Sequence, residues 1–97
     1  MATYIMLGTF TDQGIRAIKD TTKRVESFRA ACKGTGVTIK EAYWTLGQFD
    51  VLTVWEAPDD ATMTAMALSV GKLGNVRTQV LPAFNEAEMS KILGKML

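Results

Sequence analysis

Segment 49–56 is apolar on both of its faces, and this limits the folds open to the chain. Val51 and Trp55 share one parity along the segment, and Leu52 and Val54 occupy the other. Because the side chains of a strand point alternately to opposite faces, both faces of this strand need cover. An antiparallel sheet with one solvated face would show polar residues on that parity. We therefore expect helices on one face of a sheet and a partner on the other.

The order of the predicted elements indicates the fold class. Glycine, proline and polar turn residues separate apolar stretches into strand, helix, strand, strand, helix, strand and a last helix. This is the α+β order of a ferredoxin-like βαββαβ fold with an extra C-terminal helix, an antiparallel sheet and the strand order four-one-three-two. The expected strands span 4–10, 37–46, 49–56 and 76–84, and the expected helices span 15–32, 59–73 and a segment after Asn85.

Local signals support these boundaries. Thr11 or Asp12 offers an N-cap oxygen before the first helix, and Asn85 with Glu88 three residues later forms a capping box before the last one. Gly47-Gln48 is the predicted turn between the second and third strands.

The chain is short for a stable core. Ninety-seven residues predict a single domain over 1–97, and a domain of this size buries only about 60–70% of its unfolded surface. Two such sheets packed face to face would form a dimeric α/β barrel and cover the second apolar face. The alternative is a monomer whose last helix folds across that face.

Composition excludes several classes of function. The formal net charge of +1 gives no field that would attract nucleic acid or an anionic membrane. The chain has no histidine and a single cysteine, Cys32, so we expect no metal site, no cofactor and a reducing compartment. The N-terminus lacks a signal-peptide pattern and no apolar run reaches the length of a membrane span, which predicts a cytoplasmic protein.

Three segments carry a family resemblance: YIMLGTFT at 4–11, YWTLGQFD at 43–50 and GKLGNVRT at 71–78. In this order and spacing they resemble the GYD domain family of small bacterial and archaeal proteins. Phe49 stands where the family's name places a tyrosine, so a role for a hydroxyl at that position is not expected. The resemblance implies a ferredoxin-like fold of the dimeric α/β-barrel type, and it implies no established biochemical activity.

Two charged residues next to apolar strands are candidates for chemistry. Asp50, at the exit of the predicted hairpin, could act as a base or orient a ligand, or it could accept turn N–H groups or pair with Arg77. Arg77, at the entry to the fourth strand, could grip an anion, or it could pair with Asp50 or Glu56. We expect Asp50 and Arg77 to be neighbours.

Aromatic residues are candidates for an apolar pocket. Trp44, Tyr4 and Phe10 could line one, although aromatic residues in so small a chain more often belong to the core and the dimer interface. The basic residues between Arg16 and Lys33, Arg24 among them, are interpreted as a solvated helix face.

Three functions fit these observations. The first is a homo-oligomer, with itself as partner, that binds a small apolar or weakly acidic molecule between sheet and helices. The second is a cofactor-independent dimeric α/β-barrel enzyme, similar to monooxygenases or isomerases, acting on a small aromatic or carbonyl substrate. The third is an interaction module that forms higher assemblies through its edge strands. The fold alone does not choose among them, because it hosts many unrelated activities.

Overall fold

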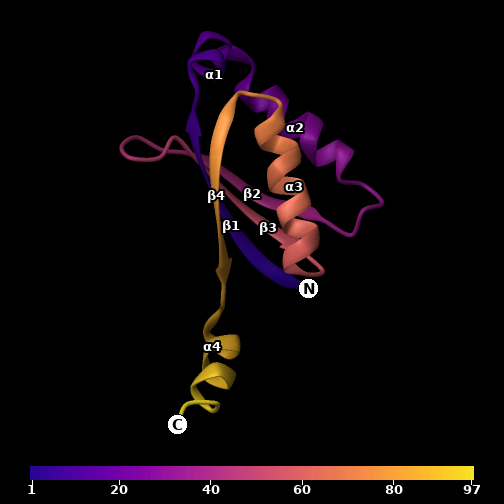
Figure 1. Ribbon diagram of the computed structural model, residues 1–97, viewed down its shortest axis with the longest axis vertical. Helices are drawn as coiled ribbons and strands as arrows, with labels where there is room; N and C mark the ends of the chain where they lie inside the picture. The colour runs from indigo at the N-terminus through magenta and orange to yellow at the C-terminus, as the bar shows by residue number, and fades with distance from the viewer.

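The computed structural model describes residues 1–97 and has the predicted ferredoxin-like α+β fold (Figure 1). Its four strands form one antiparallel sheet in the order β2-β3-β1-β4, which confirms the predicted strand order. The strands are β1 (Ala2–Phe10), β2 (Thr38–Trp44), β3 (Val51–Ala57) and β4 (Val76–Ala83), and the helices are α1 (Asp12–Arg16), the 3₁₀ helix η1 (Ile18–Asp20), α2 (Thr21–Ala31), α3 (Asp60–Lys72) and α4 (Glu86–Leu93).

One face of the sheet is covered by α2 and α3. Tyr4 and Met6 of β1 and Trp55 of β3 point into this core, and each is at most 5% exposed. From α2, Phe28 packs edge-on against Trp55 with ring centroids 5.9 Å apart. From α3, Met63 enters the same cluster and is 1% exposed. The face of β3 that carries Val51 and Trp55 is therefore the one that the helices cover.

The opposite face of the sheet has no helix over it. Strand alternation places on it five aliphatic side chains that adjoin one another across the registered strands, and we call this set the open face: Ile5, Leu7, Leu52, Val54 and Leu81. Val54 lies opposite Ile5, which lies opposite Leu81, and Leu52 lies opposite Leu7. Polar and amphipathic side chains border the set at Glu41, Tyr43, Glu56, Arg77 and Gln79. The open face thus has an apolar centre and a polar rim.

The predicted helix over 15–32 is broken into three pieces, which corrects the sequence-based expectation. Thr11 caps α1 as predicted, because its hydroxyl oxygen accepts from the Gly14 N–H at 3.1 Å. Gly14 lies so close to the α3–β4 connection that an added Cβ would be 2.0 Å from the carbonyl oxygen of Asn75. This contact directs α1 toward β4, and the chain turns at Ala17 before α2 starts. Tertiary contact thus overrides a continuous helical pattern.

The hairpin connection is also longer than predicted. Residues 45–50 form a six-residue loop between β2 and β3, where a two-residue turn at Gly47-Gln48 was expected. The ends of the loop are tied together, since the Thr45 N–H donates to the Asp50 carbonyl at 2.8 Å. In Figure 1 the loop extends from the body of the molecule.

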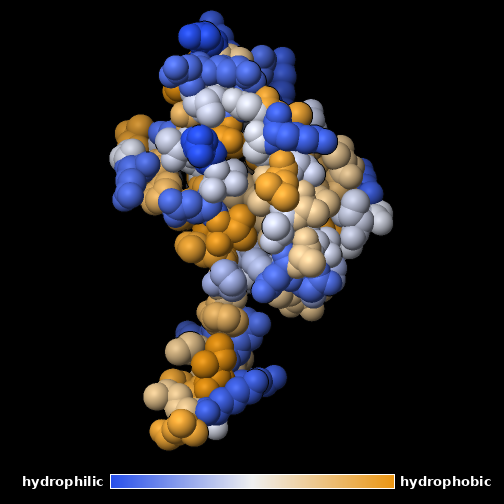
Figure 2. Space-filling view, viewed as in Figure 1, coloured by the Kyte–Doolittle hydropathy of each residue, from blue (hydrophilic) through white to orange (hydrophobic).

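The C-terminal helix α4 lies apart from the rest of the molecule, beyond the end of β4 (Figure 1). Its start is as predicted: Asn85 and Glu88 form a reciprocal capping box, with N–H···O distances of 2.8 and 2.9 Å. Figure 2 shows apolar side chains gathered along the projecting segment; the exposed ones are Met89 and Leu93 of α4 and, after its end, Met96 and Leu97. The alternative of a last helix folded across its own open face is therefore wrong.

Candidate functional site

A cavity of about 100 Å³ lies on the helix-covered side of the sheet. Its walls come from all four strands and from the facing sides of α2 and α3. Ten of its sixteen lining residues are hydrophobic, so the space favours an apolar guest. The apolar walls include Met6, Phe10, Phe28, Trp55, Val70 and Val76.

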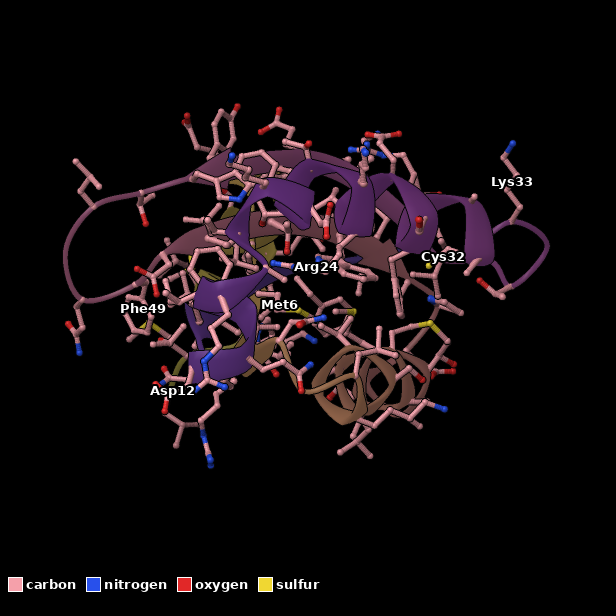
Figure 3. The ribbon with its side chains drawn as sticks, turned by 90° about the horizontal axis from the view of Figure 1, so that it is seen from above. Met6, Asp12, Arg24, Cys32, Lys33 and Phe49 are labelled. Carbon is pink, nitrogen blue, oxygen red and sulfur yellow. The ribbon has the colours of Figure 1, made fainter.

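Arg24 is the one charged residue in the lining of this cavity. The break before α2 positions it, because Nη1 of Arg24 donates to the carbonyl oxygen of Ala17 at 2.9 Å. The other terminal nitrogen, Nη2, is fully buried and has no hydrogen-bond acceptor within reach. In Figure 3 the side chain points from α2 toward the interior, where Met6 lies. A cation is thus presented to an apolar space.

The neighbouring polar groups do not satisfy Arg24. The Thr53 hydroxyl oxygen accepts from Nε1 of Trp55 at 2.6 Å, and the Thr21 hydroxyl oxygen accepts from Nε1 of Trp44 at 3.0 Å. The ion pairs of the structure join Arg29 to Glu26 and Lys40 to Glu56, and neither includes Arg24.

The cavity adjoins a groove between α2 and α3. Four residues line both: Arg24, Phe28, Leu73 and Asn75. The groove also carries Lys23, Lys72 and Asp20. Arg24 therefore contributes to the walls of both the cavity and the groove.

Of the five residues predicted to bind a ligand, Phe10 lines this cavity. Tyr4 and Trp44 lie on the same side of the sheet but outside the lining. The Tyr4 hydroxyl donates to a carboxylate oxygen of Asp60 at 2.5 Å, and this hydrogen bond raises the pKa of Tyr4 from 10.0 to about 12. Trp44 is 41% exposed and held by its bond to Thr21.

Asp50 and Arg77 do not form the expected pair. The Asp50 carboxylate accepts from the Phe10 N–H at 2.9 Å, and the Asp50 N–H donates to the Gly8 carbonyl at 2.9 Å. Arg77 is exposed and lies opposite Thr9 on β4, so β1 separates the two residues. It forms no ion pair with Asp50 or with Glu56, which pairs with Lys40 at 3.2 Å. The expectation of an Asp50–Arg77 ion pair is wrong, and the structural role of Asp50 as an acceptor of N–H groups is the one observed.

Metal-binding and nucleophilic groups are the remaining candidates for chemistry in this chain. No group of three or more acidic, cysteine or histidine side chains is placed to hold a metal ion. Cys32 is 2% exposed, and burial raises the pKa of its thiol, which disfavours the nucleophilic thiolate. None of the helices has the length and apolar character needed to cross a membrane.

Sequence reasoning missed Arg24 as a site residue. It was interpreted as part of a solvated basic face, and that interpretation is wrong for this residue. Its spacing held a signal, since Arg24 precedes Phe28, which packs against the core, by four positions and therefore shares its helix face. A basic residue among other basic residues of a helix suggests solvent exposure, and this signal was stronger than the four-residue spacing from Phe28.

Comparison with known proteins supports the family resemblance. The family model described as GYD domain matches residues 4–93. A protein of Thermus thermophilus named "Glutamine synthetase and cystathionine beta-lyase binding protein" is 31% identical over 90 residues, which cover 92% of this chain and 95% of the relative. No solved structure gives a significant match to the chain. This chain belongs to the GYD domain family.

Proposed function

We propose that this protein is a homodimeric interaction protein that binds other proteins. The open face is the observation that carries the proposal, because it is a central apolar patch on a sheet whose own helices lie on the other side. Fully burying one valine or leucine side chain is worth about 1.5–3 kcal/mol. An apolar centre with a polar rim is also the usual anatomy of a protein interface.

A second copy of the chain is the proposed occupant of the open face. Packing the same patch against itself around a two-fold axis gives a closed, self-complementary dimer. This is the dimeric α/β-barrel arrangement expected from the sequence.

The helix α4 is proposed to pack against that second copy. It has eight residues, and isolated helices this short are marginal in water even when they are well capped. Because α4 has an uncovered apolar side and lies apart from its own body, contact with another chain would supply the missing burial.

The relative's name supports protein partners in addition to self-association. That protein is named for binding glutamine synthetase and cystathionine β-lyase, and the likeness extends over most of both chains. We therefore propose that the partners of this protein include metabolic enzymes. The purified glutamine synthetase and cystathionine β-lyase of the same organism can be tested by biolayer interferometry. Failure of both to bind would remove this part of the proposal and leave self-association standing.

Sedimentation equilibrium at micromolar concentration tests the dimer. The expected mass is twice the 10.6 kDa of one chain. Val54→Glu on the open face and Leu93→Glu on α4 should each shift the equilibrium toward monomer, because each would bury an unpaired charge in the interface. Ser27→Glu on α2 and Ser90→Glu on α4 are the matched controls, and both should sediment like the wild type. A wild-type mass of one chain at every concentration would overturn the proposed dimer.

Small-molecule binding between sheet and helices is a second candidate function, and the cavity favours it. The alternative of a cofactor-independent enzyme acting on a small aromatic or carbonyl substrate has less support. The lining contains no carboxylate, lysine, cysteine or tyrosine that could exchange a proton with a substrate.

A further inference from the structure

We infer that the cavity beside Arg24 is a binding site for a small monocarboxylate with an apolar tail. This inference rests on the small-molecule candidate above and does not depend on the protein partners. It specifies the chemical class of the ligand and the group that recognises it.

Arg24 carries a permanent positive charge. A guanidinium stays protonated at any pH a protein meets, so this group cannot escape burial by losing its proton. Its Nη2 atom is removed from solvent, and no carboxylate lies within ion-pair distance. Leaving a buried N–H donor without an acceptor is unfavourable. An anionic oxygen delivered by a ligand would satisfy this nitrogen.

Apart from Arg24, the walls of the cavity are mostly apolar. Beyond Arg24, the polar lining consists of the threonines at 21, 53 and 78 and of Asn75, and two of these threonine hydroxyls already accept from tryptophan N–H groups. The rest of the lining is glycine and apolar side chains. One cation facing apolar walls matches a ligand with one negative group and a hydrocarbon body. A dicarboxylate or a sugar would leave polar groups unpaired here.

The volume of the cavity limits the length of the ligand's tail. The cavity holds about 100 Å³, and an engineered cavity of roughly 150 Å³ accepts benzene. A carboxylic acid with a tail of about three to five carbons is therefore the appropriate scale.

The groove beside the cavity is the proposed route of the ligand from solvent. The groove between α2 and α3 shares Arg24 with the cavity and carries two lysines, Lys23 and Lys72, and one acidic residue, Asp20. Cations along an entry path raise the local concentration of an anion. The proposed ligand thus enters between the two helices, on the side of the sheet opposite the open face.

Isothermal titration calorimetry with isovalerate and its neutral isostere isovaleramide tests the inference. The wild type should bind isovalerate at least tenfold more tightly, because only the acid supplies a charged acceptor to Arg24. Arg24→Met, which keeps length but removes charge, should lose this preference, and Arg24→Lys should retain part of it. The control Lys33→Met removes an exposed charge that lines neither the cavity nor the groove, and it should leave the preference within about twofold.

The outcomes separate the two levels of the proposal. Equal binding of acid and amide by the wild type would overturn the role of Arg24 and keep the cavity as a small-molecule site. Binding of neither molecule, nor of other short acids from butyrate to benzoate, would overturn the site itself. Val54→Glu should bind isovalerate like the wild type, so loss of the dimer and loss of the ligand site can be told apart. If Arg24→Met does not fold, the acid-to-amide ratio of the wild type still decides the question.

Discussion

At the scale of single residues, hydrogen bonds between distant segments fasten a loop and a helix to the two ends of β1. The Asp50 carboxylate binds the Phe10 N–H and anchors the 45–50 loop to the end of β1. At the other end, Tyr4 of β1 donates to Asp60 at the start of α3. Both acidic residues act as hydrogen-bond acceptors, and neither takes part in an ion pair.

The Tyr4–Asp60 contact makes the stability of the fold sensitive to alkaline pH. Hydrogen bonding to a carboxylate raises the pKa of Tyr4 from 10.0 to about 12, so the folded state releases this proton at a higher pH than the unfolded state. The contribution is complete below pH 10 and is lost as the pH rises toward 12. Chemical denaturation at several pH values should show a steeper loss of stability for the wild type than for Tyr4→Phe. The same slope in both proteins would contradict this assignment.

At the scale of elements, the junction between α1 and the α3–β4 connection shapes the first crossover. The Thr11 N–H donates to the Asn75 carbonyl at 3.1 Å, and the Gln13 side chain donates to the Leu73 carbonyl at 2.9 Å. Gly14 allows this approach because a Cβ would overlap Asn75. The resulting break between α1 and α2 places the Ala17 carbonyl where Arg24 binds it.

Glycine substitutions at two helical positions should therefore have opposite effects. Gly14→Ala forces a Cβ against backbone atoms and should destabilise the fold by about 1–3 kcal/mol. Gly71→Ala in α3 meets no atom within 4 Å and should stabilise it by up to about 1 kcal/mol through helix propensity. Urea denaturation monitored by circular dichroism measures both. A neutral or stabilising Gly14→Ala would show that the junction is looser than the structure indicates.

At the scale of the whole molecule, two apolar surfaces lie on opposite sides of the sheet and serve different proposed purposes. The helix-covered side holds the core and the Arg24 cavity. The open face and α4 are left uncovered within one chain. Separate surfaces allow self-association and ligand binding to be altered independently.

If a second copy covers the open face, thermal stability must depend on protein concentration. For a dimer of 97-residue chains, a tenfold rise in concentration should raise the Tm by about 3 °C. Differential scanning calorimetry across two decades of concentration measures the shift. The Tm of Val54→Glu should be constant over the same range, and a constant Tm for the wild type would argue against an obligate dimer.

The sequence by itself determined the features that depend on neighbours along the chain. The order of strands and helices follows from periodicity and breakers, and the Thr11 cap and the Asn85–Glu88 capping box form between residues three positions apart. The family resemblance and the ferredoxin-like fold followed from the same local patterns.

The tertiary structure alone decided the features that depend on residues distant in sequence. Alternation showed that segment 49–56 was apolar on both parities, but only packing assigned Trp55 to the helices and Val54 to the open face. The acceptance of the Phe10 N–H by Asp50 joins residues 40 positions apart. The burial of Nη2 of Arg24 depends on the contact of α1 with the α3–β4 connection and on the packing of α2 over the sheet. Such long-range contacts leave little trace in local composition, because a charged residue on a helix has the same local signature whether it meets water or a cavity.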